Sequence, residues 1–414
     1  MERYDLLYRI YDEFDADTLR AYQDFVEVFP PIDSRIALEH WRTARDELVG
    51  RKDAIHAAFD DGETFAEIAA HATRDQAFTA LDLHSKYGRA VNVLVLDVDE
   101  TLRSAGETDN EIPRETLALL TEFHEEGVPI VICTGQTLEN VKGFTIQGMG
   151  SEVVHSGNLS IVYEAGTGVF TPNHGAETKR LLYDGLDEEI VSIFDALRSR
   201  VLPEAPEELR RGCHLQGNEF NVTMKPNFEI GSPEATDLIA DALVYELDLL
   251  ADAVAEEVGE DAERIRGWVR AFYAGSDPEI RTVLEEADAT SDADPDEAPE
   301  AIADVLERID VAYYEGDAAE IGSRELNKVV GVEAALDVLG VEDPFALVMG
   351  DSKSDLRVME WAAEGRGIAS APEHASQDVL EHVLDTDELL FDRGRSADTL
   401  RIVYALNRLA VLPG

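Results

Sequence analysis

Three short apolar runs in this sequence each stop abruptly at polar residues. The runs and the residues that follow them are 91–96 with Asp97, 128–133 with Thr134 and Gly135, and 345–349 with Gly350 and Asp351. Each run is rich in β-branched or other large apolar residues, which is typical of strands buried on both faces of a sheet. Such strands need a covering layer on each side, so they constrain the fold more than any other feature of the chain.

Helix-like sequence lies between these strands. Residues 114–126 precede the second run, and residues 332–339 precede the third. Strands that alternate with helices form parallel sheets with right-handed crossovers. We therefore predict an α/β fold with a Rossmann-like parallel sheet. Ligands of such sheets bind beyond the carboxyl ends of the strands, which is where the three polar endings fall.

The second and third runs are separated by about 200 residues, which is too many for a simple crossover. An inserted domain is therefore expected. Strand-like sequence at 220–225 and 311–314 lies inside it, together with a helix that begins at Ser232-Pro233, because serine and proline favour the cap and first turn of a helix. Residues 282–307 contain no Lys or Arg, and we expect them to form a solvated loop between helices.

The first 88 residues contain no convincing strand. Apolar residues recur at helical spacing within them, for example over 36–48. We predict an all-helical N-terminal module over 1–88. If the chain forms a homo-oligomer or binds a partner, the expected contact is through these helices.

The chain is strongly acidic. Its 414 residues include 87 Asp and Glu against 35 Lys and Arg, which gives a formal net charge of −52. Such a surface repels phosphate backbones, so we expect no nucleic-acid partner. The acidic residues are spread along the whole chain, which resembles proteins of extreme halophiles, where salt screens the self-repulsion. An acidic interaction surface on a mesophilic protein is the alternative, although acidic tails normally come in blocks.

Nothing in the sequence indicates a membrane or a secreted location. The N-terminal residues lack the uninterrupted apolar stretch of a signal peptide, and no run of about 18 apolar residues occurs. We interpret the two cysteines, Cys133 and Cys213, as reduced thiols. A cytoplasmic protein that does not bind membranes is expected.

Four carboxylates are predicted to converge at the carboxyl edge of the sheet. They belong to Asp97, Asp99, Asp351 and Asp355. Because these groups repel one another, a cation is their natural partner, and Mg²⁺ prefers oxygen ligands of this kind. Thr134 adds a hydroxyl from the neighbouring strand end, and Lys328, at the start of a helix-like stretch, adds a positive charge.

These residues carry a resemblance to the haloacid dehalogenase superfamily of phosphohydrolases. The four motifs of that superfamily match, in order, Asp97-Val98-Asp99-Glu100-Thr101, Thr134-Gly135, Lys328, and Gly350-Asp351-Ser352-Lys353-Ser354-Asp355. The long insert resembles the α/β cap of the Cof-like and sugar-phosphate phosphatase branch. The resemblance covers 89–414 and implies a first core part at 89–174, a cap at 175–319 and a second core part at 320–414.

The resemblance also implies the chemistry of the first motif. Asp97 would attack phosphorus and become an aspartyl phosphate, which splits one transfer into two steps. Asp99 would protonate the leaving alcohol and later deprotonate the attacking water, and its backbone carbonyl would bind the metal. By the same resemblance, an acid at Asp99 favours phosphatase chemistry over the dehalogenase, phosphonatase and ATPase branches, where that place is not an acid.

The other motifs would bind phosphate and metal. By the same resemblance, Thr134, Gly135 and Lys328 would hold the phosphoryl oxygens. Mg²⁺ would be bound by Asp97 and Asp351, and by Asp355 directly or through water. Two structural alternatives stay open. Asp355 could be a favourable charge at a helix N-terminus, and Thr134 could cap the following helix. We expect Lys353 to be a solvated surface lysine.

Two departures from the family pattern stand out, Glu100 where many relatives have Gly and Ser354 where many have Asn. Both leave the acidic positions intact. The expected function is therefore a Mg²⁺-dependent phosphatase for a small phosphorylated metabolite, either a sugar phosphate or a phosphoglycolate-like acid. A phosphomutase that uses the same aspartyl phosphate and a non-catalytic regulatory binding protein are the alternatives.

The distributed negative charge predicts that stability depends on salt. The Debye length falls from about 10 Å at 0.1 M salt to about 3 Å at 1 M, so repulsion within a surface of charge −52 weakens over this range. We expect the melting temperature to rise steadily as KCl increases from about 0.1 to 3 M. Thermal melts followed by circular dichroism will measure it. Full stability in dilute buffer would contradict the halophilic interpretation.

Overall fold

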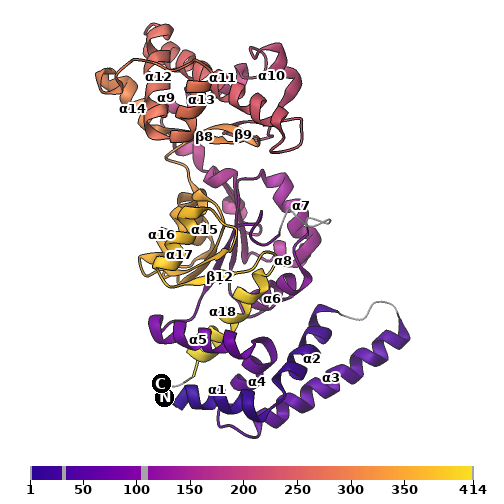
Figure 1. The fold of residues 1–414 in the computed structure, drawn as a ribbon. Coiled ribbons are helices and arrows are strands. Elements are labelled where there is room, and N and C mark those ends of the chain that lie inside the picture. Colours follow the sequence, from indigo (N-terminus) through magenta and orange to yellow (C-terminus); the bar gives the residue numbers. More distant parts are fainter. Residues whose placement is uncertain (1, 30–33, 104–110, 413–414) are drawn as a thin grey trace.

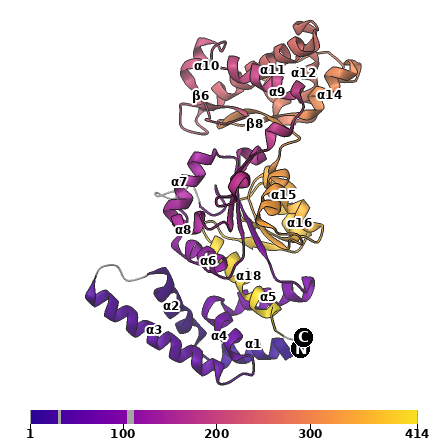
Figure 2. The same ribbon diagram turned by 180° about the vertical axis from the view of Figure 1, so that it is seen from behind.

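The protein is built from three parts stacked along one axis, as a computed structural model shows for residues 2–29, 34–103 and 111–412 (Figure 1). A layer of N-terminal helices lies at one end, a central α/β core carries the large sheet, and a second α/β domain lies at the other end. The view from behind shows the same order (Figure 2). The sheet core and the N-terminal helices share one apolar cluster, whereas the far domain has its own.

The N-terminal module consists of helices, and the described part of 1–88 contains no strand. Its helices are α1 (Glu2–Glu13), α2 (Ala16–Val28), α3 (Arg35–His56), α4 (Gly62–His71) and α5 (Arg74–Tyr87). Helices α4 and α5 pack on the C-terminal helix α18 (Ser396–Ala410). The N-terminal helices and the C-terminal helix α18 therefore lie on the same side of the core (Figure 1).

The core contains an eight-stranded sheet in the order β12-β11-β10-β1-β2-β3-β4-β5. The strands are β1 (Val93–Leu96), β2 (Ile130–Cys133), β3 (Leu159–Tyr163), β4 (Gly168–Phe170), β5 (Lys179–Leu181), β10 (Ala346–Met349), β11 (Gly367–Pro372) and β12 (Leu389–Phe391). The six strands from β12 to β3 run parallel, and β4 and β5 are antiparallel to their neighbours. The prediction of an α/β fold with a parallel sheet is confirmed, and the three predicted strands β10, β1 and β2 lie side by side.

Helices cover the core sheet on both faces. They are α6 (Arg114–Glu125), α7 (Leu138–Met149), α8 (Ser151–Val154), α15 (Lys328–Leu339), α16 (Lys353–Ala363), α17 (Gln377–Asp385) and α18. Short 3-10 helices, η1 (Glu164–Gly166), η2 (Gly175–Thr178) and η3 (Leu182–Gly185), link the last strands of this sheet. All four residues of β1, β2 and β10 are buried, which accounts for their uninterrupted apolar sequence.

The inserted domain has a four-stranded antiparallel sheet in the order β6-β7-β9-β8. Its strands are β6 (Cys213–Leu215), β7 (Val222–Pro226), β8 (Ile309–Tyr314) and β9 (Ala318–Ser323). Its helices are α9 (Glu188–Arg200), α10 (Glu207–Gly212), α11 (Pro233–Val258), α12 (Ala262–Ser276), α13 (Pro278–Glu286), η4 (Pro295–Glu297) and α14 (Glu300–Arg308). The Ser232 hydroxyl caps α11 as its sequence predicts, with Pro233 in the first turn.

Two sequence expectations need correction here. The loop expected over 282–307 is wrong at both ends, because α13 extends to Glu286 and α14 begins at Glu300. Ile302, Val305 and Leu306 of α14 are buried, so its charged residues lie on the outer face of a packed amphipathic helix. The domain boundaries at 175 and 319 also differ, because β5 belongs to the large sheet and β9 to the small one.

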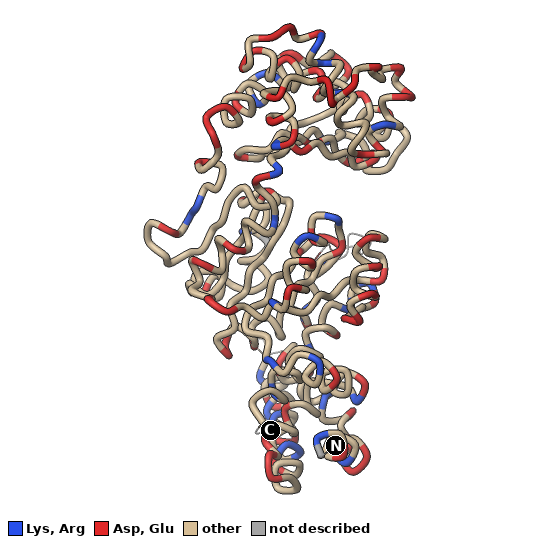
Figure 3. Tube along the Cα trace, turned by 90° about the vertical axis from the view of Figure 1, so that its left-hand side faces the viewer, with Lys and Arg blue, Asp and Glu red and all other residues tan. Residues whose placement is uncertain are grey.

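The acidic residues are spread over the whole molecule, as the sequence suggests. Acidic residues recur over all three parts of the molecule, with few basic residues between them (Figure 3). None of the described helices is both long and apolar enough to cross a membrane. Cys133 and Cys213 are both buried and unpaired.

Candidate active site

The buried amine of Lys328 lies between two carboxylates at the edge of the core sheet. Its Nζ donates to Asp97 Oδ1 at 2.9 Å and to Asp355 Oδ1 at 2.6 Å. Asp97 directly follows β1, Lys328 begins α15, and Asp355 lies in the first turn of α16. Because β1 and β10 are parallel neighbours, the residues that follow them meet at one edge. All three side chains are nearly excluded from solvent.

A third carboxylate completes the acidic cluster. Oxygens of Asp97, Asp351 and Asp355 all lie within 4.8 Å of one another. Asp351 follows β10 and accepts a hydrogen bond from the Thr101 hydroxyl at 3.3 Å. One lysine faces three carboxylates, so the described part of this cluster holds excess negative charge. Oxygen ligands at this spacing can hold a divalent cation.

Burial and mutual repulsion shift the titration of this cluster. Burial, followed by the nearby Asp355 carboxylate, raises the pKa of Asp351 to about 7. Burial also raises the pKa of Asp97 well above its ordinary value, although Lys328 opposes this shift. Burial alone would lower the pKa of Lys328, but the carboxylates of Asp355 and Asp97 outweigh it and raise that pKa. The cluster therefore binds protons readily when no other cation is present.

Local backbone geometry fixes Asp355 and the start of α16. Asp355 Oδ2 accepts hydrogen bonds from the backbone N–H of Ser352 at 3.1 Å and from the Ser352 hydroxyl at 2.6 Å. These contacts form part of a capping box. A Cβ atom at Gly350 would lie 2.3 Å from Asp355 Cβ, so only glycine fits there. The Gly350-Asp351 sequence therefore lets the helix approach the strand end closely.

A strained turn positions Lys328. Glu164, Ala165 and Gly166 all have positive φ angles, and a Cβ at Gly166 would lie 2.0 Å from the Asn327 carbonyl oxygen. The same turn is bonded to the second motif, because the Ala165 N–H donates to the Thr134 carbonyl at 3.0 Å. This contact joins the loop after β2 to the start of α15.

The residues of the second motif end β2 beside this cluster. Thr134 is buried, and its Oγ1 accepts from the backbone N–H of Gln136 at 3.1 Å, so the hydroxyl closes the local turn. Gly135 is exposed, and its carbonyl accepts from Gln216 Nε2 of the inserted domain at 3.3 Å. The parallel pairing of β1 with β2 puts both residues at the same edge as Asp97.

Asp99 lies apart from the three clustered carboxylates. Its Oδ1 accepts hydrogen bonds from Arg103 Nε at 2.9 Å and Nη2 at 2.7 Å, and its Oδ2 accepts from Gln136 Nε2. The side chain is 46% exposed, whereas Asp97 is buried. The two acids of the first motif thus occupy different environments although only one residue separates them.

Glu100 shows why this position favours glycine. Its φ angle of 54° is in the left-handed region, where a side chain is strained. The Glu100 carboxylate lies 3.2 Å from His374 Nε2 and 3.4 Å from Arg393 Nη2. Both side chains belong to the C-terminal part of the core and lie beside this loop.

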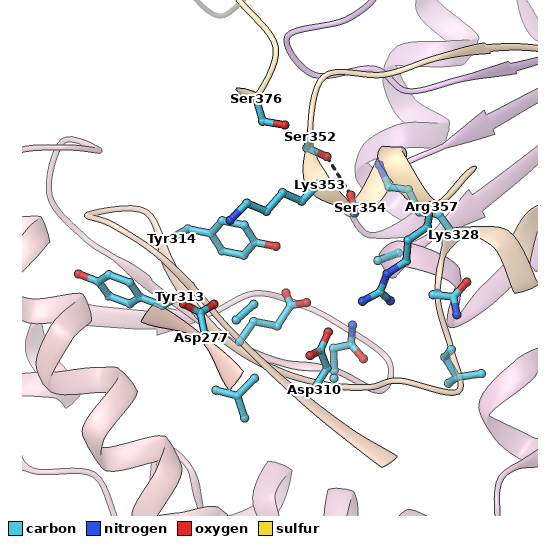
Figure 4. Close-up of a pocket in the computed structure, with 18 of the residues that line it drawn as sticks. Asp277, Asp310, Tyr313, Tyr314, Lys328, Ser352, Lys353, Ser354, Arg357 and Ser376 are labelled. Carbon is cyan, nitrogen blue, oxygen red and sulfur yellow. Dashed lines mark hydrogen bonds between the residues drawn. The ribbon is translucent and has the colours of Figure 1, made fainter. Parts of the chain in front are cut away.

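A cavity of about 610 Å³ separates the acidic cluster from the inserted domain. Core residues of α15 and α16 line one side, and strands β8 and β9 line the other (Figure 4). Lys353 and Arg357 reach into this space from α16 (Figure 4). The expectation that Lys353 is only a surface lysine is therefore incomplete, since it is exposed but lines the cavity. Its spacing of four from Arg357 on one helix was the available signal.

The inserted domain contributes mainly acceptor groups to the cavity. The acids that line it are Asp277, Glu279, Asp310, Glu315 and Glu320. Asn221 also lines it and is only 8% exposed, yet its Oδ1 has no hydrogen-bond partner among the described residues. Glu320 Oε2 accepts from the Thr223 hydroxyl at 2.7 Å. Sequence reasoning missed Asn221 and Glu320 as pocket residues, because only the pairing of β7 with β9 brings them together.

One family model matches part of the chain. Residues 276–388 match the family model of haloacid dehalogenase-like hydrolases, a range that contains Lys328, Asp351 and Asp355. Among curated proteins, no sequence matches the chain.

Several solved structures are similar in fold. Thermoplasma acidophilum 0175 is 13% identical with a TM-score of 0.43, over 77% of this chain and 100% of that one. Trehalose-6-phosphate phosphatase from Aspergillus fumigatus is 13% identical with a TM-score of 0.41, over 79% and 97%. A haloacid dehalogenase-like hydrolase from Bacteroides thetaiotaomicron is 11% identical with a TM-score of 0.42, over 76% and 98%.

The geometry predicts that Lys328 stabilises the fold as well as the site. In Lys328→Met, two buried carboxylates lose their shared cation, and breaking a buried pair in this way typically costs about 3–5 kcal/mol. We expect a loss of this order in EDTA and a smaller loss when a divalent cation is added. Chemical denaturation in high KCl will measure both values.

The control is Lys353→Met, because Lys353 is exposed and makes no ion pair among the described residues. This variant should unfold like the wild type. An equal loss for Lys328→Met with and without the divalent cation would contradict a cation site beside Lys328.

Proposed function

We propose that the chain is a haloacid dehalogenase-like hydrolase, whose family model matches residues 276–388, and that it acts as a Mg²⁺-dependent phosphatase that hydrolyses a sugar phosphate through an aspartyl phosphate. The observation that carries this proposal is the contact of Lys328 with Asp97 and Asp355, with Asp351 beside them. This set joins a nucleophilic carboxylate, a buried cation for phosphoryl oxygens and acids for a metal. The cytoplasm, where thiols remain reduced, is the proposed location.

The donor set fits Mg²⁺. Three carboxylates from two strand ends and one helix lie within reach of one another, and all of the donors are oxygens. In the proposed site, Asp97, Asp351 and Asp355 hold the ion, together with the backbone carbonyl of Asp99. Bound there, Mg²⁺ would neutralise the phosphate oxygens and offset the repulsion between the carboxylates.

The proposed reaction uses Asp97 as the nucleophile. Its Oδ1 is held by Lys328, so Oδ2 attacks phosphorus while the bond to the leaving alcohol breaks. Asp99 gives its proton to the leaving oxygen. In the second step Asp99 takes a proton from water, and that water cleaves the acyl phosphate to release inorganic phosphate.

The remaining motif residues are proposed to bind the phosphate oxygens of the substrate. Lys328 offers a buried positive charge, and the Thr134 hydroxyl and the Gly135 backbone end the neighbouring strand. Asp99 must exchange its contacts with Arg103 and Gln136 for the leaving group. Substrate binding between the core and the inserted domain is the event proposed to drive this exchange.

The far wall of the cavity favours a sugar over an acidic leaving group. Five acidic side chains of the inserted domain line it, so the carboxylate of a phosphoglycolate-like acid would be repelled there. Hydroxyl groups can instead donate to Glu320 and to the unpartnered Asn221 Oδ1. The inserted domain therefore acts as a cap that selects polyhydroxylated substrates.

The test is phosphate release from a panel of sugar phosphates and acidic phosphometabolites, in high KCl with Mg²⁺. We expect turnover of sugar phosphates that EDTA abolishes and that Asp97→Asn lacks, because no phosphoenzyme can form. Asp99→Asn should retain a burst of product with aryl phosphates. With alkyl phosphates its rate should fall about 10²- to 10⁴-fold, because their alcohol leaving groups need protonation. Rapid-quench detection of protein-bound phosphate separates the two variants.

Other outcomes would distinguish the alternatives. Isomerised sugar phosphate without phosphate release would indicate a phosphomutase. Ligand binding with no turnover of any substrate would indicate a regulatory binding protein. Labelled phosphate on the Asp97→Asn protein would overturn the assignment of the nucleophile.

A second prediction concerns the wall formed by the cap. We expect Asn221→Leu and Glu320→Gln to raise KM for the preferred sugar phosphate about tenfold, since one hydrogen bond to substrate is worth about 1 kcal/mol or more. Turnover of p-nitrophenyl phosphate should stay near that of the wild type, because its leaving group carries no hydroxyl to bind. Steady-state kinetics on both substrates will measure this.

The matched control for the cap variants is Glu256→Gln, on α11, where the carboxylate pairs with Arg200 and does not line the cavity. It should leave both substrates unchanged. If the cap variants lost activity equally on both substrates, Asn221 and Glu320 would not select the leaving group.

A further inference from the structure

A group of polar side chains, two of them buried, lies where the N-terminal module meets the core. It consists of Gln23 and Glu27 of α2, His71 at the end of α4, and Glu122 of α6. Gln23 and His71 are each only 2% exposed. None of these residues lines the cavity described above, and the N-terminal module lies at the opposite end of the core from the cap (Figure 1).

The imidazole of His71 is oriented like that of a metal ligand. Its Nδ1 lies 2.9 Å from the backbone carbonyl oxygen of Glu67. A carbonyl oxygen can only accept, so Nδ1 carries a proton, and in the neutral imidazole Nε2 presents its lone pair to the cluster. A backbone carbonyl that fixes the far nitrogen in this way is the usual support of metal-bound histidine.

The remaining contacts hold the imidazole rigidly. Arg401 Nη1 donates to the backbone carbonyl of His71 at 2.7 Å. The ring of Tyr404 lies with its centroid 4.2 Å from that of His71. Both residues come from α18, so the core itself fixes the histidine of the N-terminal module.

Two carboxylates converge on Nε2. Glu122 Oε2 lies 3.1 Å from it and Glu27 Oε2 lies 3.6 Å from it. Two ligands bound about 2.0–2.1 Å from one tetrahedral ion are about 3.3–3.4 Å apart. The observed separations bracket this value, and ligand atoms of all three residues lie within 4.8 Å of one another.

Two buried oxygens at this place lack a partner. Glu122 Oε2 has no hydrogen bond among the described residues although it lies beside the imidazole, and neither has Gln23 Oε1. Gln23 borders the cluster directly, since its Nε2 donates to Glu27 Oε1 and lies 3.1 Å from His71 Nε2. The amide oxygen and nitrogen of a glutamine exchange places by a half-turn, which would bring Oε1 to the cluster. Leaving such oxygens buried and unpaired costs about 1–3 kcal/mol each.

We propose that Glu27, His71 and Glu122 bind a structural Zn²⁺ ion, with the amide oxygen of Gln23 as the fourth ligand. One imidazole and three oxygens form a suitable tetrahedral set for zinc, whereas Mg²⁺ prefers oxygens alone. The two carboxylates balance the charge of the ion, so the site is neutral overall. Because α2 and α4 belong to the N-terminal module and α6 to the core, the ion fastens one to the other.

A proton is the rival occupant of the site. Burial alone would lower the pKa of His71, but the carboxylates of Glu122 and Glu27 raise it to about 9. An imidazolium between the two carboxylates would hold the same elements together without any metal. The experiment must therefore separate the two occupants.

The experiment measures zinc on the full-length protein in high KCl. Protein stripped with a chelator is titrated with Zn²⁺, bound zinc is counted by mass spectrometry, and Co²⁺ is used as a visible probe of tetrahedral coordination. We expect one zinc per chain and intense Co²⁺ absorption. Asp351→Asn, which disables the active-site cluster, should still bind that zinc and should melt at a higher temperature with it.

Variants of the proposed ligands complete the test. Glu27→Gln, at a partly exposed position, should fold and weaken zinc binding at least tenfold, and Glu122→Gln should do the same. Glu39→Gln on α3, an exposed glutamate outside the cluster, is the control and should bind zinc like the wild type. Absence of tight zinc binding to Asp351→Asn, or unchanged binding to Glu27→Gln and Glu122→Gln, would overturn the proposal in favour of the proton.

Discussion

The contact of Lys328 with Asp97 and Asp355 is the interaction on which the rest of the site depends. It buries one positive charge between two negative ones, with a third carboxylate, Asp351, close by. Such an arrangement is stable only where the geometry is tightly held, because each charge has lost its hydration. Around it the backbone makes unusual approaches, at Gly166 against Asn327 and at Gly350 against Asp355. These close approaches place the first turns of α15 and α16 beside the end of β1, at the cost of local backbone strain.

The cap is tied to the same strained turn. Glu164, which opens that turn, is buried, and its carboxylate accepts the backbone N–H groups of Glu219 at 2.6 Å and Phe220 at 3.2 Å. The cap also contacts the second motif through Gln216 and Gly135. Movements of the cap would thus be felt at the residues that follow β2 and at the start of α15. In the proposed function, this connects the selection of a leaving group to the placement of the residues proposed to bind phosphate.

The N-terminal module is joined to the core by a different kind of contact. Its apolar residues merge with those of the core in one cluster, and Arg401 reaches from α18 to Asp24 and to the carbonyl of His71. The module therefore covers the face of the core that is distant from the cap. The group around His71 lies within this junction, so the ion proposed there would affect how the module is held rather than the chemistry proposed at Asp97.

The sequence by itself determined the parallel sheet and the position of the acids. The three apolar runs are strands β1, β2 and β10, because residues buried on both faces must be apolar throughout, and the polar residues after them meet at one edge. Helix α14 was missed because its net acidic composition hid an amphipathic pattern that packing against the cap makes decisive. Contacts that depend on pairing between distant strands could not be predicted from the sequence either.

Only the tertiary structure decided which side chains share a space. Asn221 and Glu320 face one cavity because β7 pairs with β9 across almost 100 positions of the chain. Asp99 is turned toward Arg103 and Gln136, although its sequence spacing from Asp97 suggested a shared site. His71 meets Glu122 only when the N-terminal helices dock on α6. Local sequence fixes hydrogen bonding and burial within an element, whereas contacts between elements depend on how the whole chain packs.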